Sequence, residues 1–541
     1  MDVSSDSTDN LFDVIVIGGG CAAAHVAAPL VQNGKRVLML DGGQLPSISP
    51  DLAPDDHFES IRSRNREQDR WFLGGNLSGI AIQDFRKGLA SGNLTGNRDF
   101  VIRYAHQLLP TTSDRIQIVQ SLAKGGLGAA WGGACAFLSS QELTKMGLPA
   151  EAFKKHYDIV SRRIGISGPP EPYSVQPPAR LDHHGRALMS RYQKKQDYFQ
   201  KTGLTLTQSH LALLTQDLGQ RRATDYTDME YFCDPHRSVY RPQFTIEELE
   251  KQPHFYYRGQ MLVECVKSIP GGVSVSGFSI EQGKTNAAFS FTAHRIVLAS
   301  GAIGTARILL RSFPSLNQKT SFIAKSHTLI ACLNLSMVGQ PGDHRRTSLC
   351  QLYLQDAPTN DMLPELCAQL YSYRSPLLCR LLQSLPLPTP ESMRILASLV
   401  PSLVFADVRS PSHRATEQWL SLKQNNHPDH YSTHIHGNSD ETIDYLILKK
   451  VKKALRKLGL WPLKSVSMAP GSTFHYAGTV PIRDVETDRS LSADSSGRLT
   501  QEQKIFIADA SLFRFLPARP HTLTLMANAN RIGEIICNQL P

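Results

Sequence analysis

The stretch that decides the fold is Phe12 to Ile17, F-D-V-I-V-I, followed at once by Gly18-Gly19-Gly20. The apolar, β-branched run has the length of a strand and predicts a buried parallel strand that enters a tight turn. Residues Cys21 to Asn33 are rich in alanine, with apolar residues at helical spacing, and Gly34 stands where a helix C-cap belongs. Arg36 to Leu40 then predicts a second strand.

Strand, glycine turn, helix, strand and acid is the order that a dinucleotide site requires. Gly18 permits the turn, Gly20 lets the backbone approach a pyrophosphate, and Ala23 keeps helix and strand close, while the helix N-terminus offers free N–H groups to the phosphates. Asp41 ends the second strand and would accept hydrogen bonds from a ribose diol. Pro29 removes a helical hydrogen bond and predicts a kink about halfway along the helix. The fingerprint does not separate FAD from NAD.

Composition excludes several classes of protein. With 541 residues, 41% of them hydrophobic, the chain can bury a large core and predicts two or more lobes. The net charge is +10, but Lys and Arg are spread along the whole chain, so we expect no nucleic-acid partner. The nine cysteines form no C-x-x-C pair, which favours a reducing compartment over a disulfide framework or structural zinc.

The N-terminal residues 1–10 are acidic and polar, without the basic and apolar regions of a signal peptide. We expect them to be disordered and the protein to be cytoplasmic. No run approaches the ~18 apolar residues of a membrane span. Leu377 to Phe405 is broken by four prolines and predicts short helices joined by stiff turns, either a lid or an apolar surface with a weak peripheral membrane contact. The lysines from Lys449 to Lys457 predict the solvated face of one helix that ends at Gly459.

Two glycine-rich segments lie farther along the chain. Residues Ser121 to Phe137 read S-L-A-K-G-G-L-G-A-A-W-G-G-A-C-A-F, with glycines on both sides of Trp131. Glycine at this density lets backbone lie flat against a ligand. Arg295 to Ser300 predicts a short buried strand, and Gly301 to Leu310 predicts the glycine turn and helix that follow it.

The C-terminal region carries two histidines around one acid. His475 stands in F-H-Y-A-G-T, Asp509 in I-A-D-A-S and His521 in R-P-H-T-L-T. A histidine whose pKa lies near neutrality can take a proton from an alcohol, and two such residues close together could divide the work between base and orienter. The alternative for each histidine is a satisfied residue of the core.

Together these blocks resemble the glucose-methanol-choline (GMC) oxidoreductases, FAD enzymes that oxidise alcohols, and they stand in the same order. The Gly18 block resembles the family's FAD fingerprint, and Gly125 to Gly133 resembles its flavin-contacting loop, in the W-G-G variant of pyranose-oxidase-like members. Ala299 to Leu310 resembles its A-G-A-I-G-T-P-R-L-L-L segment. The blocks around His475 and His521 resemble its C-terminal signature.

The resemblance implies an α/β fold with two lobes. Residues 11–165, 255–312 and 466–541 would assemble a Rossmann-like FAD-binding lobe from discontinuous segments. Residues 166–254 and 313–465 would form a sheet-based substrate-binding lobe. Alternating apolar residues at Leu333 to Met337 and at Cys350 to Leu354 predict strands in this second lobe.

The resemblance also assigns residues. His475 would be the general base, and His521 would hydrogen-bond the same alcohol oxygen. Asp509 and Ser511 would contact the pyrophosphate or ribityl region of FAD, and Val266 the adenine through its backbone. The full set of expected cofactor contacts is Gly18, Gly20, Ala23, Asp41, Gly125, Gly126, Trp131, Gly132, Val266, Gly301, Asp509, Ser511 and Thr522.

Three positions depart from the family pattern. Ala306 replaces a proline in the Gly301 segment, which costs turn rigidity but no chemistry. Ala130 replaces the histidine that links flavin covalently in pyranose-oxidase-like members, so we expect non-covalent FAD that denaturation releases. His521 stands where many members have asparagine, so its role is assigned by position.

The implied function is oxidation of the CH–OH group of a sugar, polyol or sterol-like alcohol, with the proton going to histidine and the hydride to flavin N5. The same fold also hosts flavoprotein lyases and a decarboxylase, and a non-catalytic flavin-binding subunit is a third reading. The substrate, the electron acceptor (oxygen, a quinone or a redox protein) and the oligomeric state stay open.

A further histidine cluster comprises His427, His430, His434 and His436. No cysteine and no ordered carboxylate pattern near it completes a ligand set. We therefore expect no metal site.

Overall fold

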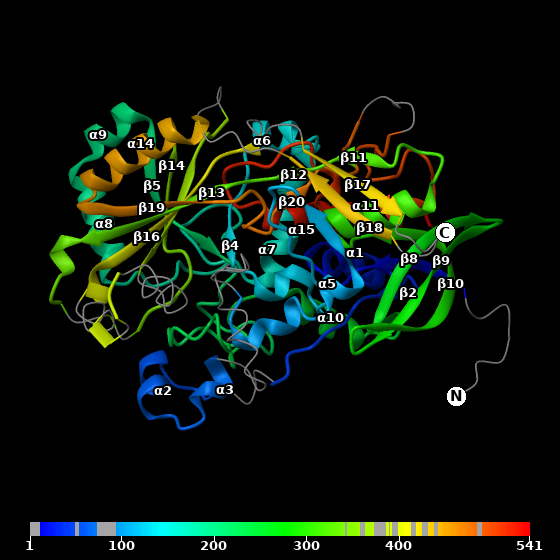
Figure 1. The fold of residues 1–541 in the computed structure, drawn as a ribbon, viewed down its shortest axis with the longest axis horizontal. Helices are drawn as coiled ribbons and strands as arrows, with labels where there is room; N and C mark the ends of the chain where they lie inside the picture. The colour runs from blue at the N-terminus through cyan, green and yellow to red at the C-terminus, as the bar shows by residue number, and fades with distance from the viewer. Residues whose placement is uncertain are drawn as a thin grey trace.

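The computed structural model describes residues 11–48, 54–72, 94–340, 343, 345–357, 363–372, 386–388, 390–391, 399–412, 418–424, 431–437, 442–483 and 490–540. Residues 1–10, most of the segment from Leu377 to Phe405, and His427 and His430 lie outside this set. The chain is a mixed α/β protein with several sheets. Two large sheets stand at opposite ends of the molecule in Figure 1.

The first large sheet contains the predicted N-terminal strand, β1 (Leu11–Ile17), at its centre. Its neighbours are β2 (Val37–Leu40) and β10 (Lys284–Leu298), both parallel to it. The parallel part is completed by β7 (Phe255–Arg258) beside β2 and β21 (Ile505–Ile507) beside β10. The long β10 continues into an antiparallel meander with β9 (Gly272–Glu281) and β8 (Met261–Ile269). Strands from three distant parts of the sequence therefore share one sheet.

The helix that follows β1 is α1 (Cys21–Gln32), which is buried along almost its whole length. It packs against the C-terminal helix α15 (Thr522–Cys537), and a Cβ atom on Gly533 would lie 2.5 Å from Pro29 Cγ. Pro29 lies in the last turn, so the expectation that it interrupts the middle of the helix is wrong. Gly34 adopts the left-handed conformation (φ 72°) expected just after a helix end.

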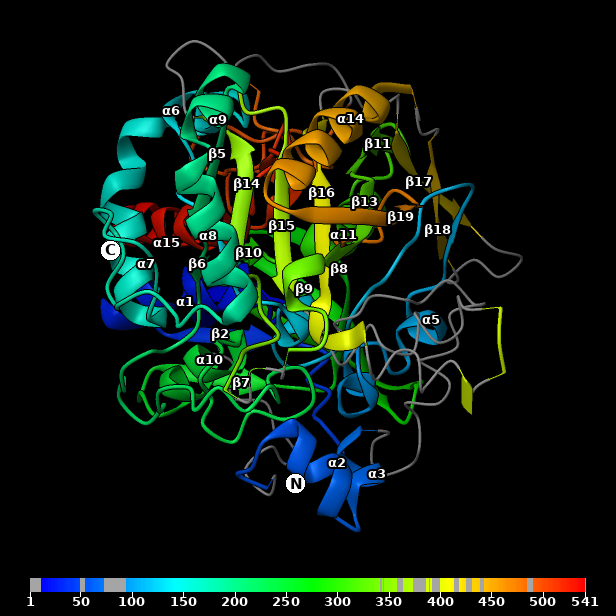
Figure 2. The ribbon, with the colours of Figure 1, turned by 90° about the vertical axis from the view of Figure 1, so that its left-hand side faces the viewer.

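The second large sheet is antiparallel throughout. Its order is β19 (Leu460–Met468), β13 (His327–Asn334), β16 (Leu403–Arg409), β15 (Cys367–Ser372), β14 (Leu352–Asp356) and β5 (Leu204–Gln208). The helices α8 (His183–Lys194), α9 (Gln196–Thr202) and α14 (Thr442–Lys457) cover one of its faces, as Figure 2 shows. A separate apolar core lies between these helices and the sheet.

The structure also contains three small sheets. One has the order β11 (Lys319–Ser321), β17 (Trp419–Gln424), β18 (Tyr431–His436) and β3 (Thr111–Ser113). The others pair β12 (Ile323–Ala324) with β20 (Tyr476–Ala477) and β4 (Ala134–Cys135) with β6 (His210–Leu211). The remaining helices are α2 (Phe58–Arg64), α3 (Gln68–Phe72), α5 (Ala105–Leu108), α6 (Ser140–Lys145), α7 (Phe153–Ile164), α10 (Pro242–Glu250) and α11 (Gly301–Ser312).

Several sequence predictions can be compared with these elements. The helix at Lys449 to Lys457 is confirmed as part of α14, and Gly459 follows it with φ 77°. The strand at Cys350 to Leu354 is displaced by two residues, to β14. The prediction of a strand at Leu333 to Met337 is wrong after Asn334, because β13 ends there and a 3-10 turn follows.

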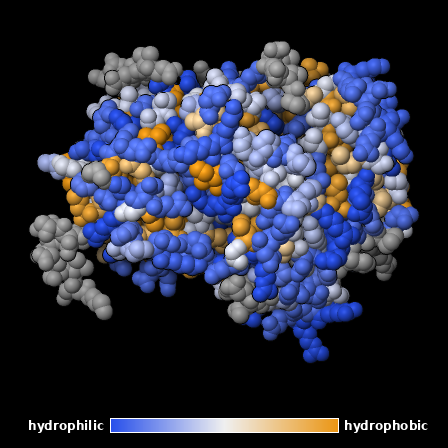
Figure 3. Space-filling view, turned by 180° about the vertical axis from the view of Figure 1, so that it is seen from behind, coloured by the Kyte–Doolittle hydropathy of each residue, from blue (hydrophilic) through white to orange (hydrophobic). Residues whose placement is uncertain are grey.

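The surface is largely hydrophilic on the face shown, and the described cysteines form no disulfide. On the face seen in Figure 3, hydrophilic side chains predominate and hydrophobic ones occur in small separate groups. Within the described ranges, we find no helix with the length and apolar character needed to cross a bilayer. The eight cysteines that the structure describes are all free thiols.

Candidate active site

A large cavity lies between the two large sheets. On one side it is bounded by the carboxyl ends of β1, β2 and β10, and on the other by residues of β15 and β16. The space between its lining atoms, including the open mouth, is about 1850 Å³. The predicted site residues that line it are Gly18, Gly20, Asp41, Gly126, Trp131, Gly132, Gly301, His475, Asp509, His521 and Thr522.

The first glycine turn is crowded by its neighbours. Gly18 has φ 110°, and a Cβ atom there would lie 2.5 Å from the carbonyl oxygen of Ala299. A Cβ atom on Gly19 would lie 2.3 Å from Asp41 Oδ2, so Gly19, which the fingerprint left unassigned, is the glycine that makes room for the acid. A Cβ atom on Gly20 would come no closer than 3.9 Å to another protein atom. Gly20 thus faces open space in the cavity.

Asp41 is a buried acid at the end of β2, with 7% of its surface exposed. Tyr257 Oη donates a hydrogen bond to Asp41 Oδ2 over 2.9 Å. Burial raises the pKa of Asp41 to about 6, while the hydrogen bonds from Tyr257 and from the backbone of Gly42 and Gly43 oppose that rise. Asp41 is therefore mostly charged at neutral pH, and the charged carboxylate can accept hydrogen bonds from hydroxyl groups.

The second glycine-rich segment lies against the first. Its residues Gly126–Ala130 form a 3-10 turn, and a Cβ atom on Gly126 would lie 3.2 Å from Gly20 Cα. A Cβ atom on Gly128 would lie 2.7 Å from Cys21 Sγ, at the start of α1. Ala130 is buried and lines the cavity.

Asp509 follows β21 and faces α11. Its Oδ1 accepts a hydrogen bond from the backbone N–H of Ser511 over 2.9 Å, and its Oδ2 accepts one from Thr305 Oγ1 over 2.6 Å. Burial raises the pKa of Asp509, and these hydrogen bonds oppose that rise. The carboxylate thus joins the third glycine turn, at Gly301, to the C-terminal block.

Four expected cofactor residues do not line the cavity. Ala23 is fully buried in α1, as its predicted packing role requires. Gly125 and Ser511 lie next to residues that line the cavity. The structure does not place Val266 there, because its backbone N–H donates to Ser312 Oγ over 2.9 Å. Leu262 and Val263, earlier on β8, line the cavity instead.

The two predicted histidines meet inside the cavity. The rings of His475 and His521 are edge to face, with centroids 4.5 Å apart. The Nδ1 atom of each ring is buried and has no hydrogen-bond partner within the described parts of the chain. The pKa of each histidine lies well below its usual value, first because of burial and further because of nearby positive charge from Lys325 and Arg409. Both rings are therefore neutral at physiological pH.

The positive charge comes from a cluster that sequence reasoning missed. Arg409, the last residue of β16, lines the cavity and donates from Nε and Nη2 to Asp407 Oδ2, over 3.0 and 2.7 Å. His327 Nδ1 lies 2.6 Å from Asp407 Oδ1. These partners hold the pKa of Asp407 well below its usual value against the effect of burial. Lys325 donates to the carbonyl of Pro517, and burial lowers its pKa to about 7.

No local signal could have identified this cluster. Arg409 and Asp407 stand in L-V-F-A-D-V-R, and Lys325 in F-I-A-K-S, which are unremarkable segments. Gln369 and Tyr371, on β15, also line the cavity, and Tyr371 Oη donates to Gln369 Oε1 over 2.5 Å. Only the pairing of β13, β15 and β16 brings these side chains to the histidines.

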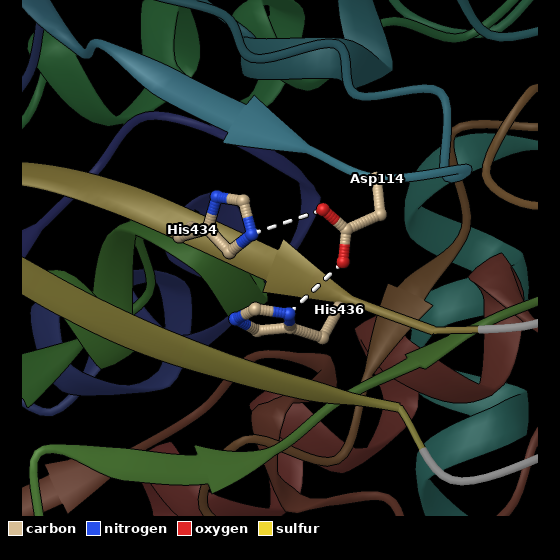
Figure 4. Close-up of side chains that lie close together, drawn as sticks. All are labelled: Asp114, His434 and His436. Atoms are coloured by element: carbon tan, nitrogen blue, oxygen red, sulfur yellow. Dashed lines mark hydrogen bonds and ion pairs between the residues drawn. The ribbon is translucent and has the colours of Figure 1, made fainter.

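The structure brings a carboxylate to two of the surface histidines, a neighbour that the sequence prediction of no metal site did not include. His434 and His436 lie within ion-pair distance of Asp114, a carboxylate more than 300 positions earlier in the sequence. The three side chains are drawn in Figure 4. They lie on the β3–β18 side of a small sheet and do not line the cavity.

No family model and no curated protein matches this chain.

Proposed function

We propose that this chain is an FAD-dependent oxidoreductase of the GMC type that oxidises the CH–OH group of an alcohol. One observation carries the proposal: the glycine turns at Gly18, Gly126 and Gly301 line the same cavity as two histidines whose buried Nδ1 atoms have no hydrogen-bond partner within the described residues. The parallel strands β7-β2-β1-β10-β21, with α1 leaving β1 at the glycine turn, support a Rossmann-like FAD lobe.

The residues present suit a flavin dinucleotide. Gly18 to Gly20 and the N-terminus of α1 would hold the pyrophosphate, and Asp41 would hold the ribose. Gly126, Trp131 and Gly132 would lie against the flavin part. When bound, FAD would supply the acceptor for the carbinol hydride, and the protein would supply binding, orientation and proton transfer.

The histidine pair suits proton removal from an alcohol. A base must be neutral before it can accept a proton, and both rings are neutral because their pKa values are depressed. A depressed pKa also weakens a base. The same cations, however, would stabilise the negative charge that develops on an alcohol oxygen bound beside His475, so they would favour loss of its proton. His521 would hold that oxygen in place.

The antiparallel sheet supports the role of a substrate lobe. Its strands β15 and β16 contribute Gln369, Tyr371 and Arg409 to the wall beside the histidines. These side chains offer hydrogen-bond donors and acceptors to a polyhydroxylated compound, which favours a sugar or polyol over a sterol-like alcohol.

The direct test is the absorbance spectrum of the purified protein, before and after anaerobic addition of sugars, polyols and sterol alcohols. We expect a yellow protein whose flavin absorbance is bleached by at least one of these alcohols and whose flavin is released by denaturation. A protein that takes up no flavin even after reconstitution with FAD would refute the family proposal. A yellow protein that no alcohol bleaches would refute the activity while leaving the cofactor in place.

A further inference from the structure

We infer that Asp114, His434 and His436 form a Zn²⁺ site on the surface of the small sheet. The inference is independent of the flavin site. His434 and His436 stand at alternate positions of β18, so their side chains leave the strand on the same face. Asp114 directly follows β3, which pairs in parallel with β18. The sheet therefore places two imidazoles and one carboxylate at one point, as Figure 4 shows.

The distances between the three side chains suit one metal ion. His434 Nε2 lies 3.2 Å from Asp114 Oδ1, and His436 Nδ1 lies 2.9 Å from Asp114 Oδ2. All three ligand atoms lie within 4.8 Å of one another. With metal–ligand bonds of about 2.0–2.1 Å, two ligands of a tetrahedral zinc ion are about 3.3 Å apart. Small side-chain rotations would bring all three atoms onto one ion.

The surroundings of the histidines orient them as metal ligands. Thr112 Oγ1 lies 2.7 Å from His434 Nδ1, and the two residues are directly paired between β3 and β18. When Nδ1 donates its proton to Thr112, Nε2 presents its lone pair toward Asp114, which is how the outer contacts of zinc-bound histidines fix the tautomer. Trp419, paired with His436 across the sheet, stacks on its ring with centroids 4.8 Å apart.

Exposure and charge leave the site accessible to zinc. The side chain of Asp114 is 50% exposed and that of His436 is 28% exposed, so the ion can enter from solvent and keep a water molecule as its fourth ligand. One carboxylate and two neutral imidazoles would offset part of the charge of Zn²⁺. Nitrogen ligands also disfavour Ca²⁺ and Mg²⁺, which prefer oxygen.

The position gives the ion a structural role. The segment that begins at Asp114 continues to Val119 and Leu122, which line the cavity. Tyr476, next to His475, accepts a hydrogen bond from the backbone N–H of Val119 over 2.9 Å. Zinc at Asp114 would tie the start of this cavity wall to β18.

The test is a titration of the full-length protein, freed of metal by a chelator, with ZnCl₂ by isothermal titration calorimetry. We expect one Zn²⁺ per chain at this site, binding at least tenfold more weakly in His434→Ala and Asp114→Asn. Thr112→Val, which keeps all three ligands and loses only the orienting hydroxyl, should weaken binding by ~10-fold. Excess Mg²⁺ or Ca²⁺ should not compete.

A matched control is available in a second group of one histidine and two carboxylates: His236, Asp55 and Asp225. His236→Ala should leave both stoichiometry and affinity unchanged. Because free cysteines also bind zinc, Co²⁺ should be titrated in parallel, and its spectrum should lack the intense thiolate charge-transfer band. Unchanged Zn²⁺ affinity in both His434→Ala and Asp114→Asn, or absence of saturable binding in the wild type, would overturn the inference.

Discussion

The two walls of the cavity are built in different ways. One wall consists of the three glycine turns at Gly18, Gly126 and Gly301. Added Cβ atoms on Gly18 and Gly126 would meet backbone, and one on Gly19 would meet the buried Asp41. The other consists of His475 and His521 with two nearby cations. Arg409 ends β16 of the antiparallel sheet, and Lys325 lies just before β13 of the same sheet. The first wall depends on residues without side chains, and the second depends on the positions of charged side chains. Under the proposed function, the first wall would hold the cofactor and the second would move the proton.

The strongest test of this division is His475→Ala. Loss of a positioned base lowers rates by ~10²–10⁴-fold, so we expect the rate of anaerobic flavin reduction by the best alcohol to fall by that factor. The flavin content should stay at the wild-type level, because His475 lies in the charged wall. His106→Ala, at an exposed position of α5, is the control. Reduction at the wild-type rate would show that another group acts as the base.

The next largest effect is expected on stability, from Lys325→Met. The folded-state pKa of Lys325 is lowered to about 7, so the folded state disfavours its charged form. The difference from the usual ~10.4 corresponds to roughly 4 kcal/mol at or below pH 7. Allowing for the hydrogen bond lost to Pro517, we expect the free energy of unfolding at pH 7 to rise by about 1–3 kcal/mol in this variant.

The pH dependence of the unfolding free energy provides a second test of Lys325→Met. Between pH 7 and pH 10 the unfolded lysine binds a proton that the folded lysine lacks, so wild-type stability should rise with pH relative to the variant. Removal of the charge should also raise the pKa values of His475 and His521, which would move the acid limb of kcat/KM to higher pH. Urea unfolding at several pH values measures the first effect. Lys155→Met, at an exposed lysine, should change neither quantity.

An effect of similar size, on cofactor affinity, is expected from Gly19→Ala on the glycine wall. The new methyl group would lie 2.3 Å from Asp41 Oδ2 and would displace that carboxylate. Loss of hydrogen bonds to a charged group costs ~1.5–3 kcal/mol, so we expect the Kd for FAD to rise by about 10- to 150-fold. Gly20→Ala, whose methyl group meets no protein atom closer than 3.9 Å, is the matched comparison. Any FAD lost in that variant would report contact between the methyl group and the cofactor itself.

The smallest effect is expected from Tyr257→Phe. The variant removes a hydrogen bond that lowers the pKa of Asp41 from the value that burial alone would give, so this pKa should rise above about 6. Flavin affinity should fall by a few-fold at pH 7, and the loss of FAD on acidification should begin at a higher pH, since the acid must be ionised to accept ribose hydroxyls. Tyr256→Phe, at the exposed neighbouring position of β7, should behave as wild type in a flavin fluorescence titration. Identical pH profiles for Tyr257→Phe and wild type would contradict the role given to Asp41.

The glycine wall could be predicted because its signals are local. A β-branched run, a glycine triplet and an alanine-rich helix specify β1, the turn and α1 within about twenty consecutive residues, and the third turn carries a similar pattern. The histidines could be singled out because titratable residues stood beside glycine and threonine in short blocks. Gly19 was not singled out, because its crowding depends on the position of Asp41, which the turn alone does not reveal.

Local sequence patterns predict the order of strand, turn and helix at the first and third glycine turns and single out the two histidines that line the cavity. Three features depend on the tertiary fold. Lys325 and Arg409 lie close enough to lower the pKa values of those histidines, the backbone N–H of Val266 donates to Ser312, and Asp114 lies beside His434 and His436. The reason is physical. Backbone conformation depends on neighbouring residues, whereas electrostatic environment and ligand geometry depend on which strands pair, and the pairing of β13 with β16 or of β3 with β18 joins residues about 80 and 320 positions apart.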